Sequence, residues 1–170
     1  MKKRKVVRRM KAKRTVRKAK SKKPFVVTDR NIHRIMNLPN GTIIHAYKVT
    51  TLKGKGPHEP RRGLIYRARQ TYTEEFVDMD QNENCAAGLH LATLRWCLNL
   101  TEWGGHIAPG KDRKYKLFLA ETVKDDLTCV PFDTDGKFRV RQLKLLKTVK
   151  VTKGDEERAV NQKNAQDYAR

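Results

Sequence analysis

Apolar residues recur at every second position in several short stretches in the middle of the chain. Residues 43–50, IIHAYKVT, combine this alternation with β-branched and aromatic side chains, which is typical of a strand. Residues 115–122, YKLFLAET, place Tyr115, Leu117 and Leu119 on one face of another strand. Further strands are predicted at 64–69, 72–77, 127–131 and 138–149, the last as one strand or a strand pair. The pattern therefore predicts a sheet.

Two other stretches have a helical pattern. Residues 29–38 predict a short helix with Asp29 or Thr28 as its N-cap. Residues 85–91 predict a short strand that enters an amphipathic helix over 92–100, since the apolar residues recur at helical spacing. Turns are predicted at 38–41, which contains Pro and Gly, and at the hairpin signal 133–136.

Charge divides the 170-residue chain into three parts. Residues 1–23 hold fourteen Lys and Arg and no acidic residue, whereas 151–170 hold four basic and four acidic residues. Because the first segment has few apolar residues and its like charges repel, it is predicted to be a disordered basic tail. Residues 24–150 are predicted to form a single α+β domain: a small, mostly antiparallel sheet with one or two short helices. Residues 151–170 are predicted to be a polar C-terminal tail.

The net charge of +21 predicts a polyanion as the partner: DNA, RNA or an anionic membrane face. DNA or RNA is favoured, because the apolar residues of the basic segment include no aromatic residue and no Leu. A flexible cationic segment contacts phosphates and carries no sequence preference. Four arginines near the middle of the chain are also predicted to bind nucleic acid, because Tyr66 and Tyr72 lie near them in the sequence as candidate rings for base stacking. The predicted nucleic-acid-binding residues are Lys2, Lys3, Arg4, Lys5, Arg8, Arg9, Lys11, Lys13, Arg14, Arg17, Lys18, Lys20, Lys22, Lys23, Arg61, Arg62, Arg67 and Arg69.

Two further clusters of charge have weaker interpretations. Lys137, Arg139 and Arg141 are alternate residues of a predicted strand, so they form a candidate second basic stripe. Glu74, Glu75, Asp78 and Asp80 form an acidic cluster, and a solvated patch explains it better than an acid–base pair does.

The segment CAAGLHL holds Cys85, Gly88, Leu89 and His90 and is interpreted as a structural motif. Gly88 is expected to supply an unusual backbone angle, and His90 to hydrogen-bond the backbone at the strand-to-helix junction. A nucleophile and base made of Cys85 and His90 is the catalytic alternative. The spacing of the cysteines and histidines fits no common zinc site, so neither a metal nor a cofactor is expected.

The same segment resembles the CxxGLH motif of the rIIB-like family of bacteriophage proteins. LPNGTIIHAYKV, the segment from Asp126 to Pro131, and the closing residues 137–146 are similar to the family's other segments in order and spacing. The resemblance covers about 111 residues, from Pro39 to Val149. It implies a small α+β phage domain, and it implies no known reaction.

These observations predict a small basic phage protein that binds nucleic acid non-specifically through its tail and carries an rIIB-like docking domain. The alternatives are a virion component that contacts packaged nucleic acid, and an enzyme with its site around Cys85 and His90. The absence of a long apolar run predicts no membrane span and no signal peptide. Three cysteines, an odd number, fit free thiols in a reducing compartment. The predicted location is the host cytoplasm, with the virion as the alternative, and a phage or host protein is a candidate partner of the folded domain.

Overall fold

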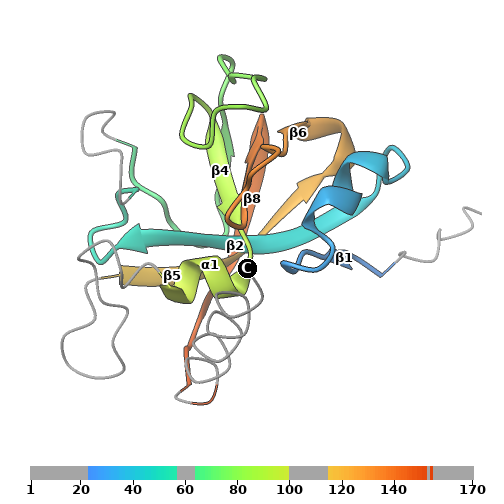
Figure 1. Cartoon of the computed structure of the whole chain (residues 1–170). Helices are drawn as coiled ribbons and strands as arrows, with labels where there is room; N and C mark the ends of the chain where they lie inside the picture. The colour runs from blue at the N-terminus through green and yellow to red at the C-terminus, as the bar shows by residue number, and fades with distance from the viewer. Residues whose placement is uncertain (1–22, 57–63, 100–114, 153, 155–170) are drawn as a thin grey trace, which may run out of the picture.

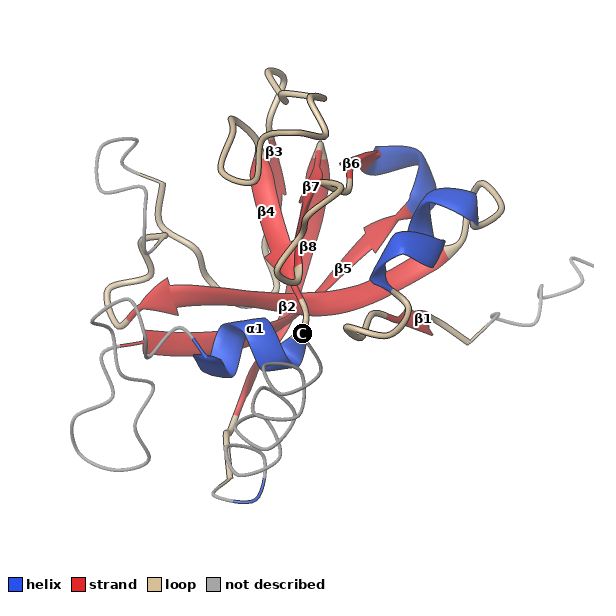
Figure 2. Ribbon diagram, viewed as in Figure 1, coloured by secondary structure: helices blue, strands red, loops and turns tan. Residues whose placement is uncertain are grey.

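The computed structural model describes residues 23–56, 64–99, 115–152 and 154 of the chain. The elements in chain order are β1 (Phe25–Val26), η1 (Ile32–Asn37), β2 (Ile43–Thr51), β3 (Thr71–Thr73), β4 (Leu89–Ala92), α1 (Leu94–Asn99), β5 (Tyr115–Val123), η3 (Lys124–Asp126), β6 (Leu127–Cys129), β7 (Lys137–Val140) and β8 (Gln142–Val149). Figure 2 shows that strands are the main regular structure in this part of the chain and that its helices are short. The α+β class with few, short helices is confirmed.

The strands of the described residues form one eight-stranded sheet, which is larger than the small sheet that the sequence predicts. Its order is β3-β8-β5-β2-β4-β7-β6, and β1 pairs with β2 in parallel at the side. The pairs along the main path are antiparallel. The strand that the sequence does not predict is β1, which is only two residues long and too short to leave an alternation in the sequence.

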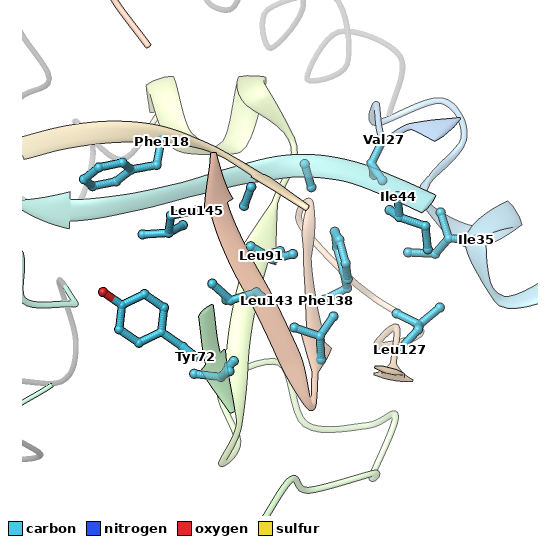
Figure 3. Close-up of a cluster of buried hydrophobic side chains, with 14 of the residues drawn as sticks. Val27, Ile35, Ile44, Tyr72, Leu91, Phe118, Leu127, Phe138, Leu143 and Leu145 are labelled. Atoms are coloured by element: carbon cyan, nitrogen blue, oxygen red, sulfur yellow. The ribbon is translucent and has the colours of Figure 1, made fainter. Parts of the chain in front are cut away.

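The two longest strands position the rest of the sheet. β2 and β5 pair from Ile43↔Val123 to Thr51↔Tyr115, and Figure 1 shows them running side by side across the molecule. β4 and β8 rise from this pair, so the sheet is strongly twisted. The main core lies between these strands, where Ile44, Leu91, Phe118, Phe138 and Leu145 gather from five strands (Figure 3).

A second, smaller core lies under α1. Cys97 and Leu98 of the helix are buried and pack with Val49 and Leu117 of the two long strands. Thr93, the residue before the helix, caps its N-terminus, because the Thr93 Oγ1 accepts a hydrogen bond from the Trp96 N–H at 3.2 Å. The predicted strand 85–91 and helix 92–100 are therefore present in shorter form as β4 and α1, and residues 85–88 are not part of the strand.

Residues 64–69 form no strand, contrary to the prediction. Arg69 has a φ of 66°, in the left-handed region, and residues 68–69 make a turn before β3. The predicted strand 72–77 is present only as Thr71–Thr73, because the chain leaves the β8 ladder after that point.

The predicted helix at 29–38 is a 3₁₀ helix, η1, and its N-cap residue is Asn31 in place of Asp29 or Thr28. Asp29 contacts α1 instead. Its Oδ1 accepts a hydrogen bond from Thr93 Oγ1 at 2.8 Å, and its Oδ2 lies 3.0 Å from Arg95 Nε. This contact across the fold outweighs the local preference of an aspartate for its own helix.

Within the predicted domain 24–150, the structure describes residues 24–56, 64–99 and 115–150. The tail residues Lys2 to Lys22, the loop that holds Arg61 and Arg62, and most of the predicted C-terminal tail lie outside them.

Candidate functional site

The structure brings four exposed cations together at one edge of the sheet. Arg67 and Arg69 lie just before β3, and Lys144 and Lys147 lie on β8. The Arg69 N–H donates to the Leu145 carbonyl at 2.6 Å, which ties the two segments together. β3 and β8 are the last two strands on this side, with Thr71 opposite Lys144. We call Arg67, Arg69, Lys144 and Lys147 the edge cations.

Sequence reasoning found two of the edge cations and missed the other two. Lys144 and Lys147 are three residues apart, so they break the strict alternation of a strand. A bulge explains the spacing, because the register with β5 passes from Lys147 opposite Leu119 to Leu145 opposite Ala120. The signal in the sequence that could have identified them is the pair of lysines on either side of Leu145, which is buried.

The aromatic part of the prediction at this edge is wrong. Tyr66 and Tyr72 are buried, and their ring centroids lie 4.8 Å apart. The Tyr72 hydroxyl donates to the Ile65 carbonyl at 3.0 Å and accepts from the Arg67 N–H at 2.6 Å. These rings therefore support the loop and are not available to stack on bases.

The candidate basic stripe at 137–141 is also wrong, because Lys137 is 8% exposed and Arg139 is 0% exposed. Arg139 Nη1 donates to the Glu83 carbonyl at 2.7 Å, and Nη2 donates to the Asp80 carbonyl and lies 2.8 Å from Cys129 Sγ. Its guanidinium fixes the loop 78–84 against the sheet.

Cys85 is exposed, and its hydrogen bond is made with Lys137. The Lys137 Nζ lies 3.1 Å from Cys85 Sγ, 3.8 Å from an oxygen of Asp135, and 5.1 Å from the centre of the Trp96 ring. The catalytic alternative makes His90 the base for Cys85. The group that contacts the Cys85 thiol is instead the ammonium of Lys137.

Gly88 has the backbone angle that the sequence suggests, with a φ of 135°. A Cβ at this position would lie 2.7 Å from Cγ1 of Val77, closer than real Cβ atoms approach. Leu89, the next residue, is buried in the main core. The motif is thus built around a glycine that turns the chain into β4 and lies close to Val77 of the same loop.

His90 lies opposite Arg139 in the β4–β7 ladder. Burial lowers the pKa of His90 to about 3. The positive charges of Lys48, Lys137 and Arg139 act in the same direction, and a backbone hydrogen bond opposes them. The imidazole is therefore neutral at pH 7 and a weak proton acceptor, which fits a structural role better than a catalytic one.

The carboxylates Glu75, Asp78 and Asp80 of the predicted acidic patch are exposed, and Glu74 is half-buried. Within the described ranges, no group of three or more His, Cys, Asp or Glu side chains is placed to hold a metal ion. No helix in the same ranges is long and apolar enough to cross a membrane.

No protein-family model, no curated protein and no solved structure matches this chain.

Proposed function

We propose that this protein binds DNA or RNA without sequence preference, mainly through residues 1–23. The observation that carries the proposal is the concentration of charge: this segment holds fourteen of the 39 Lys and Arg residues and no acidic residue. Such a segment gains free energy when phosphates replace its counterions, and it contacts the backbone of any sequence.

The edge cations support the proposal from the folded domain. They come from two segments more than 70 positions apart in the sequence, and each side chain is exposed. Their placement along one sheet edge gives a tail-bound nucleic acid a second contact. The domain then orients the polyanion that the tail captures.

The rIIB-like motif supports a bacteriophage setting. Under this proposal the protein acts in the host cytoplasm, and the sheet domain docks on a phage or host protein while the tail holds the nucleic acid.

A salt titration tests the proposal. The full chain and a chain lacking residues 1–22 are titrated on two unrelated duplexes. If about ten cations meet phosphates, log K of the full chain falls against log salt with a slope of about −9. The shortened chain is expected to keep weak binding with a shallow slope, and both probes are expected to give the same values. Equal affinity and slope for the two chains would contradict a tail-based mechanism.

A further inference from the structure

Three large apolar side chains are exposed on one pair of loops. Phe76, Met79 and Phe132 are 80%, 69% and 63% exposed. The loop before β4 and the loop before β7 are joined, since the Phe132 N–H donates to the Gln81 carbonyl at 2.9 Å. Figure 1 shows the loop before β4 projecting from the sheet beyond the end of β4. Large apolar side chains held on fixed loops mark an interaction surface.

The same two loops are acidic, although the protein is strongly basic. Residues 74–88 and 131–136 hold seven of the eighteen Asp and Glu residues and no Lys or Arg. The remainder of the chain holds 39 basic and eleven acidic residues. Lys137, the first residue of β7, lies 3.8 Å from a carboxylate oxygen of Asp135 in the second of these loops. We call residues 74–88 and 131–136 the acidic-apolar surface.

The surface fits a partner that is basic and also carries apolar side chains. Residues 1–22 have this composition: thirteen Lys and Arg, no acid, and the apolar side chains Val6, Val7, Met10 and Val16. The segment joins the domain at Lys23, the first described residue. Twenty-two residues span up to about 70 Å when extended, which exceeds the diameter of a domain of this size. A tethered segment of this length also reaches an effective concentration of about 1 mM.

We propose that the acidic-apolar surface binds residues 1–22 of the same chain when no nucleic acid is present. Acidic side chains take the place of phosphates, and the three apolar side chains cover Val and Met side chains of the segment. Phosphates and the surface then compete for the same cations. The apparent affinity for nucleic acid is therefore the intrinsic affinity multiplied by the fraction of molecules whose residues 1–22 are undocked. The docking of residues 1–22 does not depend on the proposed function, whereas the competition with nucleic acid rests on it.

Zero-length carbodiimide cross-linking of the full chain tests the docking directly. The expected products, identified by mass spectrometry, join lysines of residues 1–22 to carboxylates of residues 74–83, and they disappear at high salt. Cross-linking of an equal mixture of ¹⁵N-labelled and unlabelled protein is expected to give products within one chain. Absence of these products, or a predominance of mixed-isotope products that assigns the surface to a second copy, would overturn the proposal.

A triple variant separates this surface from general charge effects. Phe76→Ser, Met79→Ser and Phe132→Ser together remove exposed groups, so the fold is retained, and the cross-links are expected to fall by about 3- to 10-fold. The matched control changes the other exposed apolar residues, Val26→Ser, Leu52→Ser and Ile65→Ser, and is expected to keep them. Equal cross-linking of the two variants would overturn the apolar part of the docking.

Binding of duplex DNA distinguishes docking from function. In the full chain, the Phe76, Met79 and Phe132 variant is expected to bind DNA about 3- to 10-fold more tightly than the parent. In chains lacking residues 1–22, it is expected to bind equally. If cross-links form and DNA neither displaces them nor binds the tail, the docking holds and the nucleic-acid function fails. If DNA binds through the tail and no cross-links form, the docking fails and the function holds.

Discussion

Gly88 combines a left-handed backbone angle with a lack of room for any side chain. Its φ is 135°, and an added Cβ would lie 2.7 Å from Val77 Cγ1. Gly88→Ala is therefore expected to lower the free energy of unfolding by about 2–4 kcal/mol, part from backbone strain and part from the clash. Urea denaturation of the parent and the variant measures the difference.

Two controls separate the causes at Gly88. Gly41 has a φ of 71° and no atom within 4 Å of an added Cβ, so Gly41→Ala is expected to cost only about 1 kcal/mol. Val77→Ala removes the clashing methyl groups, so Gly88→Ala is expected to cost less in that background. Additive losses from the two substitutions would show that the contact with Val77 is unimportant.

His90 makes stability depend on pH. Its pKa is lowered from 6.5 to about 3 in the folded protein, so the unfolded chain binds more protons between these two values. The contribution of His90 to stability is fully present above pH 6.5 and is lost progressively as the pH falls towards 3. At about pH 5 the loss is about 2 kcal/mol. Denaturant midpoints measured across this range test the expectation.

Glutamine substitutions identify the titrating residue. His90→Gln is expected to flatten this part of the pH profile, because the side chain no longer titrates. His33 is exposed on η1, and His33→Gln is expected to keep the parent profile. A profile that is unchanged in His90→Gln would assign the pH dependence to other groups.

At the scale of the element, the sequence predicted the parts of the fold that are long or locally determined. The strands at 43–50 and 115–122 correspond to β2 and β5, and the stretch 138–149, predicted as one strand or a strand pair, forms the pair β7 and β8. Their alternation records burial on one face, which is a property of the strand itself. β1 pairs with β2 over only two residues, so this distant contact decides it and local pattern does not.

The candidate site follows the same rule. The local signals at Gly88 and at the Arg67 and Arg69 pair lead to the observed backbone angle and to exposed side chains. The alternation at Lys137 and Arg139 led to an error, because the loop 78–84 covers that strand and takes up the guanidinium. The residue pattern of β7 cannot predict that it is covered by a loop more than 50 positions earlier in the chain.

Arg139 fastens that loop, and its removal is expected to release it. Arg139→Met removes the guanidinium that donates to the carbonyls of Asp80 and Glu83, so we expect a loss of about 3 kcal/mol in the free energy of unfolding. Amide hydrogen exchange at 78–84 is expected to accelerate more than exchange in β2. Arg141→Met, at an exposed arginine two residues away, is the control and is expected to change stability by less than about 0.5 kcal/mol. Similar exchange in both variants would show that the loop is held by other contacts.

At the scale of the whole molecule, charge is segregated by position. Residues 74–88 run from the end of β3 to the start of β4 and residues 131–136 lead into β7, whereas the edge cations lie before the start of β3 and on β8. An evenly charged surface with the same total would attract a polyanion from every side. Under the proposed function, this distribution gives a polyanion one favoured side, and under the proposed docking it gives the basic tail an alternative place to bind.

This segregation predicts that residual binding by a chain lacking residues 1–22 depends on which cations are removed. Changing Arg67, Arg69, Lys144 and Lys147 to Gln is expected to make the slope of log K against log salt shallower by about 3 to 4 units, because up to four phosphate contacts are lost. The control changes four exposed cations elsewhere, Arg30, Arg34, Lys53 and Lys116, and therefore alters the net charge equally. Its slope is expected to stay close to that of the unchanged shortened chain. Circular dichroism confirms that both variants are folded, and the titration uses one duplex and one buffer throughout. An equal reduction in both variants would mean that the domain attracts nucleic acid through its total charge, with no role for the β3–β8 edge.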